Sequence, residues 1–213
     1  MKDKPNEWVS IADLMAGVMA VVMLLLVVSV LQRNYSELKH RQELEQGVAA
    51  QKKAAEKVMT EMRQTFSSMG LSNLVEFDLA MHRLTLKDNV FTRGSACITA
   101  NARPAFEKVQ VHISEYFSRV KDAQIIIEGH TDNLPVHRPV TDYERFCTVY
   151  DDNYTLSAAR AREARKLLIG ALDSQHARSL IVAGYGDSQP LKNVSASDGR
   201  NRRVEVRFAY LGK

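Results

Sequence analysis

The chain has 213 residues, of which 45% are hydrophobic and 25% are charged, values that are ordinary for one globular domain with an appendage. Its formal net charge is +4, and its sequence pI is about 9.1. This excess of positive charge would suit nucleic-acid binding, but the basic residues are interleaved with acidic ones and form no stripe with aromatic side chains. The composition therefore argues against a direct nucleic-acid partner.

An apolar run at residues 9–31 predicts one transmembrane helix. The side chains in it that are not apolar, glycine or alanine are Ser10, Asp13 and Ser29. As a helix the run would be about 35 Å long, enough for a hydrocarbon core of roughly 30 Å. A cleaved signal peptide is the alternative, but the run is long for that purpose, contains Asp13 and is followed by no small-residue cleavage site. Basic residues flank the run on both sides in similar number, so charge alone does not set the orientation.

Asp13 is an acidic residue inside this run, and it has no basic partner on the same helix. A charged side chain within hydrocarbon costs roughly 2.5–3.5 kcal/mol even on the mildest scale, so an unpaired carboxylate there indicates a function. Such a group can bind and release a proton as its surroundings alternate between wet and dry. The alternative is that Asp13, near the start of the run, reaches the interface and does nothing. Small residues along one side of the helix suit close packing against partner helices: Ala12, Ala16, Gly17 and Ala20.

Residues 32–69 contain no proline and are rich in Glu, Gln, Lys, Ala and Met, a composition that predicts a helical connector. Apolar side chains recur at a ragged spacing of three and four residues, with a polar interruption at Gln42 and Glu45. This pattern is compatible with a weak, dimeric coiled coil that extends the membrane helix. A solvated connector helix without a partner is equally compatible with it. The apolar positions are Leu31, Tyr35, Leu38, Val48, Ala55, Val58, Met62, Phe66 and Met69.

From residue 70 onward the chain alternates short strand-like and helix-like segments, which predicts an α/β sandwich domain over residues 70–213. The strand at 123–128 contains three successive isoleucines, and the last strand alternates apolar with polar residues. The expected fold class is therefore α+β, with a single transmembrane helix, a helical connector and this domain. Strands are expected at residues 74–78, 83–87, 123–128, 179–183 and 203–210, and amphipathic helices at 104–119 and 157–172.

The two cysteines, Cys97 and Cys147, both follow the apolar run. If that side of the membrane is the periplasm, oxidation to a disulfide is permitted. Such a bridge could pin the long polar loop at residues 134–152, which contains Cys147. Two buried free thiols are the alternative.

Four segments of the second half resemble the OmpA-like peptidoglycan-binding family. They are IEGHTDN at residues 127–133, NYTLSAARA at 153–161, GYG at 184–186 with Pro190, and GRNRRVE at 199–205. The resemblance covers roughly residues 70–213 and implies non-covalent binding to the diaminopimelate of the cell-wall stem peptide. The loop at residues 134–152 is longer than is usual in that family, which leaves the shape of the pocket open.

By this resemblance the peptidoglycan-binding residues are Asp132, Arg160, Thr131, Asn153, Leu156 and Arg202, with Arg203 as the alternative to Arg202. The two principal charges fit a zwitterion, because Asp132 can accept from an ammonium group while Arg160 grips a carboxylate in a bidentate fork. Ser157 is expected to cap the second helix, which would place Arg160 in its first turn, where backbone N–H groups favour an anion. A direct ion pair between Asp132 and Arg160 is the alternative.

The segment WVSIADLMAG at residues 8–17 resembles the start of the transmembrane helix in the MotB family of flagellar stators and in their Zorya relatives from anti-phage defence. The matching aspartate of those proteins binds the proton, so the resemblance implies that Asp13 carries the translocated ion, H⁺ being favoured over Na⁺. It also implies a MotA/ZorA-like multi-pass membrane subunit as partner and a homodimer of this chain within the complex. The short connector between membrane and domain favours the B component of a Zorya system.

These expectations place residues 1–8 in the bacterial cytoplasm, residues 9–31 in the inner membrane, and residues 32–69 and 70–213 in the periplasm. A flagellar-type stator subunit and a passive membrane-to-wall tether are the competing functions. An enzyme built on His130 and Asp132 is poorly supported, because no third metal ligand stands at a sensible spacing and no nucleophile motif is present. No catalytic residue, cofactor or bound metal is therefore expected.

Overall fold

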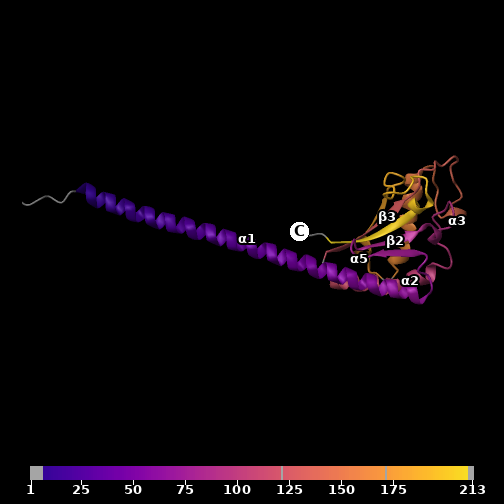
Figure 1. Cartoon of the computed structure of the whole chain (residues 1–213), viewed down its shortest axis with the longest axis horizontal. Coiled ribbons are helices and arrows are strands. Elements are labelled where there is room, and N and C mark those ends of the chain that lie inside the picture. Colours follow the sequence, from indigo (N-terminus) through magenta and orange to yellow (C-terminus); the bar gives the residue numbers. More distant parts are fainter. Residues whose placement is uncertain (1–6, 121, 171, 211–213) are drawn as a thin grey trace, which may run out of the picture. The chain divides into compact units, whose positions relative to one another are not determined.

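The structure, a computed structural model, describes residues 7–120, 122–170 and 172–210 (Figure 1). It divides into two compact units, Met1–Val48 and Ala49–Lys213. Within the described residues the first unit is helical throughout, whereas the second contains a sheet with helices packed on it. The fold class is α+β, as the sequence predicted.

Helix α1 spans Glu7–Ser68 and supplies all of the described part of the first unit. Its apolar side chains there are exposed, with 70% of the surface of Leu14 and 60% of that of Leu25 free. In the described part of the chain, α1 is the single helix that is long and apolar enough to cross a membrane, and none of its apolar stretch is buried. An apolar surface on all sides, without protein against it, is what a span at residues 9–31 requires.

The last turns of α1 belong to the second unit and form part of its core. Val58, Met62 and Phe66 are fully buried there. The ring of Phe66 packs edge-on against that of Phe106, with the ring centroids 5.4 Å apart. The later part of the apolar stripe, from Ala55 to Phe66, therefore packs against the domain of its own chain, whereas Leu31, Tyr35 and Leu38 of the same stripe are exposed. The compact unit accordingly begins at Ala49, upstream of the boundary expected from the sequence.

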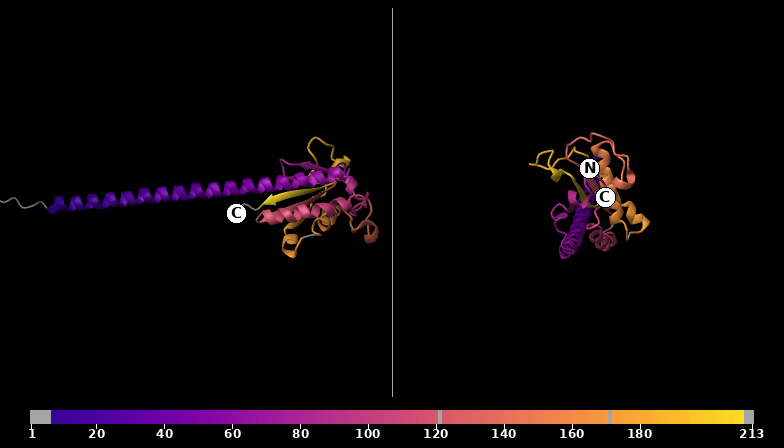
Figure 2. Two further views of the ribbon diagram at one scale, coloured as in Figure 1. Left: turned by 90° about the horizontal axis from the view of Figure 1, so that it is seen from below. Right: turned by 90° about the vertical axis from the view of Figure 1, so that its right-hand side faces the viewer.

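The described part of the second unit contains a five-stranded sheet with helices packed against it (Figure 2). Its order is β1-β2-β5-β3-β4, with β3 and β4 parallel and the other neighbouring pairs antiparallel. Every strand begins and ends close to where the sequence predicted it. The strands are β1 Val75–Asp78, β2 Arg83–Lys87, β3 Ala123–His130, β4 Leu180–Gly184 and β5 Arg203–Tyr210.

The two faces of the sheet differ in chemistry because neighbouring side chains of a strand point to opposite sides. Val204, Val206 and Phe208 of β5 are buried in the apolar core, while the residues between them are charged. Helices α2 (Arg103–Arg119) and α4 (Asn153–Leu168) contribute the other side of this core. Shorter helical segments lie in the loops: η1 Asp88–Val90, α3 Tyr143–Phe146, α5 Ser174–Arg178 and η2 Gly199–Asn201.

The helix expected at residues 157–172 begins four residues earlier than predicted. Its N-cap is Asp152, whose carboxylate accepts from the backbone N–H of Thr155 at 2.6 Å. The prediction that Ser157 caps this helix was wrong, because an aspartate placed earlier offers an equally good cap. The Ser157 hydroxyl instead accepts from the backbone N–H of Gly186 at 2.9 Å. Arg160 consequently lies beyond the first turn, away from the free N–H groups of the helix end.

Candidate functional site

Two glycines allow the sheet to approach α4 closely. A Cβ at Gly129 of β3 would lie 1.9 Å from the carbonyl oxygen of Ser157, so no other residue fits there without a shift of the backbone. Gly184 of β4 faces α4 with similarly little room. This contact brings Asp132, two residues beyond β3, into the same region of the domain as Arg160 of α4.

Arg160 is 1% exposed and is one of the largest fully buried side chains of the described residues. Its Nε donates to the carbonyl oxygen of Ser95 at 3.0 Å, and its guanidinium carbon lies 5.3 Å from the centre of the Phe91 ring. Its Nη1 lies 3.2 Å from Oδ1 of Asp88, an ion pair that does not meet hydrogen-bond geometry. Burial lowers the pKa of Arg160, and the Asp88 carboxylate opposes that shift. The guanidinium is thus a buried cation that keeps donor capacity for a further anion.

Asp88, in η1, connects this cation to a second one. Its Oδ2 accepts from Nε of Arg202 at 2.9 Å, while its Oδ1 faces Arg160. Asp88 lies outside the recognised motifs and 114 residues before Arg202 in the chain. No local spacing pattern joins residues this far apart, so the contact follows only from the folded arrangement.

Asp132 is 5% exposed and has two unlike carboxylate oxygens. Its Oδ2 accepts from Nη1 of Arg202 at 2.6 Å, a short charge-assisted contact. Among the described residues its Oδ1 has only a long contact, 3.4 Å, from the backbone N–H of Leu134. Burial lowers the pKa of Arg202, but the hydrogen bonds to Asp132 and Asp88 outweigh it, and the net shift is upward.

The four side chains form an alternating series of charges: Arg160, Asp88, Arg202 and Asp132. Within the described residues, Asp132 and Arg160 pair with different partners and not with each other, so the direct ion pair considered from the sequence is not what the structure contains. The series is neutral overall. At one end of the series Oδ1 of Asp132 can still accept a hydrogen bond, and at the other end the guanidinium of Arg160 can still donate one.

The polar residues expected around this pair support the loop that follows β3. Asn153 donates through Nδ2 to the carbonyl oxygens of Asp132 and Leu134, at 3.2 and 3.0 Å. The backbone N–H of Thr131 donates to the carbonyl oxygen of Gly186 at 2.8 Å, while its buried hydroxyl has no partner among the described residues. Leu156 is 7% exposed and lies within α4.

A disulfide between Cys97 and Cys147 holds the long loop against the segment that precedes α2. The backbone contacts beside it are close, because the Phe146 carbonyl oxygen accepts from Ser95 Oγ at 2.9 Å and from Ala96 N–H at 3.0 Å. Ser95 also receives the Nε hydrogen bond of Arg160. The disulfide therefore fixes the backbone that positions the buried guanidinium.

A groove of about 780 Å³ begins at the charged series and extends over the polar face of the sheet. Asp88, Phe91 and Arg202 line it, so it reaches two members of the series. Its basic lining residues outnumber its acidic ones, which favours an anionic or zwitterionic occupant. The basic residues are Arg83, Lys87, Arg93, Arg200, Arg202 and Arg203, and the acidic ones are Glu76, Asp88 and Glu205.

His130 is buried within the second unit. It is 2% exposed, it stacks on Tyr185 with the ring planes 9° apart, and neither ring nitrogen has a hydrogen-bond partner among the described residues. Burial, followed by the nearby Arg203, lowers its pKa to about 4, so it is neutral at physiological pH. A buried neutral imidazole beneath a tyrosine ring does not fit the hydrolytic alternative built on His130 and Asp132.

Asp13 lies in α1 within the first unit, and its side chain is exposed. It stands among exposed apolar side chains, including Leu14 and Met15. The charged environment of Asp132 and the apolar environment of Asp13 are thus opposite in kind.

Comparison with known proteins places these features in a family context. Residues 90–203 match the model of the OmpA family, a range that includes Asp132, Arg160 and Arg202. Motility protein B of Bacillus subtilis is 30% identical over 165 residues, which cover 74% of this chain and 57% of that protein. The Zorya protein ZorB of Escherichia coli is 25% identical over 99% of this chain and 90% of its own length.

The fold also has a counterpart among solved structures. A putative MotB-like protein from Desulfovibrio vulgaris superposes with a TM-score of 0.54 at 22% identity, covering 75% of this chain and 96% of that one. At this identity the likeness concerns the fold alone.

Proposed function

Because the chain belongs to the OmpA family, we propose that it is a membrane-anchored wall-binding protein, the B-type subunit of an ion-driven motor in the bacterial inner membrane. Its second unit binds diaminopimelate-type peptidoglycan, and α1 provides the membrane anchor and the ion site. The observation that carries the proposal is the alternating series from Arg160 to Asp132 at the motif positions. The function is binding and transmission of force, not catalysis.

The wall ligand fits the series through its two opposite charges. The side chain of diaminopimelate in a stem peptide carries an ammonium group and a carboxylate on one carbon. The ammonium group would donate to Oδ1 of Asp132, to which the described part of the chain offers only a 3.4 Å contact. The carboxylate would accept from the guanidinium of Arg160. Asn153, Thr131 and Leu156 would hold the loop around the ligand.

Arg202 would adjust when the ligand enters. It is the most exposed member of the series, with 36% of its side-chain surface free, and it holds Oδ2 of Asp132. A long side chain at this exposure reorients easily, whereas the buried Arg160 does not. Arg202 would therefore keep the site neutral without a ligand and yield part of the Asp132 carboxylate to the incoming amine.

The first unit supports membrane insertion with the second unit outside. Its exposed apolar surface requires lipid or partner helices around it. Since peptidoglycan lies in the periplasm, the N-terminus would be cytoplasmic and the second unit periplasmic. The disulfide between Cys97 and Cys147 suits that oxidising compartment.

Asp13 would bind the translocated ion, H⁺ in preference to Na⁺. One helix cannot form a channel, so a MotA/ZorA-like multi-pass subunit would surround it and respond to the change in its charge. A homodimer of this chain within the complex would supply two such carboxylates. The wall contact would hold the subunit still while the partner moves.

The Zorya type fits the chain better than the flagellar type. ZorB aligns with 99% of this chain and 90% of its own length, whereas the chain spans 57% of the length of the Bacillus motility protein. A flagellar-type stator subunit is the second candidate, favoured by the higher identity of 30% to that protein. Loss of phage protection against loss of swimming, in the bacterium that encodes the chain, separates the two.

The binding site is tested with the full-length chain in detergent, sedimented with purified diaminopimelate-type peptidoglycan. Asp132→Ala and Arg160→Ala should each weaken retention at least about 10-fold, since each removes a charged hydrogen-bond partner of the ligand. Asp132→Asn and Arg160→Lys keep the size or the charge and cover the case in which an alanine variant does not fold. Arg178→Ala, which removes an exposed arginine of α5 outside the groove, is the control and should bind normally. Unchanged retention by correctly folded Asp132 and Arg160 variants would contradict the site.

A further inference from the structure

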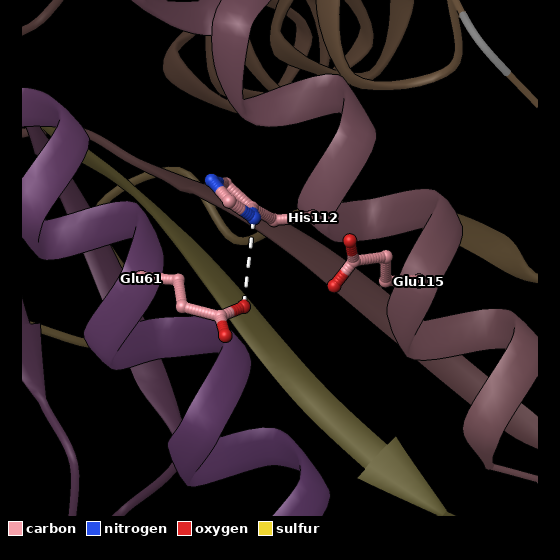
Figure 3. A group of neighbouring side chains, drawn as sticks. All are labelled: Glu61, His112 and Glu115. Carbon is pink, nitrogen blue, oxygen red and sulfur yellow. Dashed lines mark ion pairs between the residues drawn. The ribbon is translucent and has the colours of Figure 1, made fainter.

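A second group of ionisable side chains lies between α1 and α2, away from the charged series. Glu61 extends from α1, and His112 and Glu115 extend from α2 toward it (Figure 3). One ligand atom of each residue lies within 4.8 Å of those of the other two. His112 and Glu115 are three residues apart on a helix and therefore share a face. All three residues belong to the second unit.

The hydrogen bonds of Thr65 favour a proton on Nε2 of His112. The Thr65 hydroxyl donates to the carbonyl oxygen of Glu61 at 3.1 Å, so its hydrogen is already engaged. The same oxygen lies 3.4 Å from Nε2 of His112, and with its hydrogen engaged it is placed to accept there, an arrangement that suits a proton on Nε2. In the neutral imidazole Nδ1 then carries a lone pair.

That lone pair faces another acceptor. Nδ1 of His112 lies 3.6 Å from Oε2 of Glu61. Both atoms are buried, and neither has a hydrogen-bond partner among the described residues. Two lone pairs that face each other away from solvent are stabilised by a cation between them, either a proton on Nδ1 or a metal ion that the nearby carboxylate of Glu115 also reaches.

The neighbouring basic side chains leave room for such a cation. Lys57 is 3.8 Å from the other oxygen of Glu61, Oε1, and its side chain is 58% exposed. Arg119 is 3.4 Å from Oε2 of Glu115 and is 40% exposed. Both can swing into solvent, so neither occupies the space between His112 and Glu61.

The second group with similar composition behaves differently. Glu128, His130 and Glu205 also lie within 4.8 Å of one another. Their carboxylates, however, already pair with arginines from the sheet: Arg83 and Arg203 with Glu205, and Arg207 with Glu128. A further cation would be repelled there, which singles out the group between α1 and α2.

We propose that Glu61, His112 and Glu115 form a Zn²⁺ site that joins the end of α1 to α2. One imidazole nitrogen with two carboxylate oxygens suits Zn²⁺, whereas Mg²⁺ and Ca²⁺ prefer oxygen ligands throughout. Metal–ligand bonds of about 2.0–2.1 Å in a tetrahedron separate two ligand atoms by about 3.4 Å, close to the 3.6 Å between Nδ1 and Oε2. Water would take the fourth position. Thr65 orients the imidazole through its other nitrogen, as the outer partners of metal-bound histidines do.

The site is tested by competition between the full-length chain in detergent, first stripped with a chelator, and a chromophoric Zn²⁺ chelator. We expect one Zn²⁺ per chain. His112→Gln and Glu61→Gln should weaken binding at least about 100-fold, and Thr65→Val about 10- to 100-fold, because it removes the group that orients the imidazole. Glu107→Gln, which changes an exposed glutamate of the same helix, is the matched control and should bind like the unaltered chain.

Thermal unfolding supplies a second readout. Zn²⁺ at about 100 times its dissociation constant should raise the Tm of the second unit by roughly 5–10 °C, and not in His112→Gln. In chelator, Glu115→Gln and His112→Gln should unfold near the Tm of the unaltered chain, which shows that they fold. Absence of Zn²⁺ binding would overturn the proposal, as would Zn²⁺ binding of unaltered strength in His112→Gln. Neither result would bear on peptidoglycan binding, which uses other residues.

Discussion

The apolar side chains of α1 are exposed in the first unit of this chain and buried in the second, although one helix contributes to both units. In the first unit Leu14 and Leu25 are exposed, and apolar residues surround the helix on all sides over residues 11–31. In the second unit the apolar residues of α1 form one stripe, and Val58, Met62 and Phe66 are fully buried. The same helix thus exposes its apolar side chains in one part and buries them in a protein core in the other. The pattern of apolar residues along the sequence decides between the two.

The surroundings of acidic side chains also differ between the two units. Asp13 stands among exposed apolar side chains, whereas Asp132 is buried beside Arg202. A buried charge is tolerated where an opposite charge compensates it. An unpaired charge in an apolar stretch is costly and therefore indicates a function. Replacement of Asp13 is therefore expected to affect biological activity, and replacement of Asp132 to affect retention on peptidoglycan.

Asp13→Asn should produce the largest effect. It removes the charge and leaves the size almost unchanged, so membrane insertion and retention on peptidoglycan should stay normal. Biological activity should fall at least about 100-fold, because an amide cannot bind and release a proton at the pH of the cell. The readout is phage plaquing or swimming in the bacterium that encodes the chain, with Glu56→Gln, an exposed carboxylate in the second-unit part of α1, as the matched control. Full activity of Asp13→Asn would favour a passive tether.

Phe66→Ala should destabilise the second unit by about 3–5 kcal/mol, since it opens a cavity beside Phe106. Leu25→Ala, in the apolar half of the same helix, should change the unfolding free energy of that unit by less than about 0.5 kcal/mol. Denaturant unfolding of the full-length chain in detergent measures both. Equal effects of the two changes would show that the helix does not divide as described.

Removal of the disulfide by the double change Cys97→Ala and Cys147→Ala should cost the second unit about 2–4 kcal/mol. The bridge joins residues 50 positions apart, and the unbridged chain therefore gains freedom mainly when unfolded. The change should also loosen the backbone around Ser95, which accepts from Arg160. Unfolding with and without reductant tests this, because reductant should weaken the unaltered chain and leave the double variant unaffected.

The smallest expected effect is a pH dependence that arises from His130. Its folded-state pKa of about 4 lies below the ordinary value of 6.5, so the fold prefers the neutral ring. Its contribution to stability is complete above pH 6.5 and is lost as the pH falls toward 4, by no more than about 3 kcal/mol. His130→Gln should flatten the stability profile between pH 6.5 and 4, whereas His137→Gln, an exposed histidine, should leave it unchanged. An unaltered profile in His130→Gln would contradict this assignment.

The sequence predicted those parts of the fold that depend on local pattern. Strict alternation in β5 and the isoleucine run of β3 located those strands, because burial of one or both faces imposes that order. The start of α4 was missed because Asp152 and Ser157 are both good caps, and local preference does not choose between them. The stripe on α1 was found, but such a stripe does not state whether its partner is another chain or the same one.

Only those residues of the candidate site that lie in the recognised OmpA-like segments could be predicted from the sequence. Asp132 and Arg160 stand in recognisable segments, and the structure brings them into one charged series. Asp88 could not be found from the sequence, because it contacts Arg160 and Arg202 only after β2 and β5 pair. The group of Glu61, His112 and Glu115 was missed for the same reason, since it forms between two helices that are distant in the chain.

The proposed wall binding depends on recognition of a zwitterion by Asp132 and Arg160 of the second unit. Diaminopimelate-type and lysine-type peptidoglycan test it directly, because the lysine side chain has the ammonium group but lacks the carboxylate beside it. Full-length chain in detergent should sediment with the diaminopimelate type at least about 10-fold more strongly, and Arg160→Lys should reduce that preference. Equal retention on the two walls by the unaltered chain would contradict the claim.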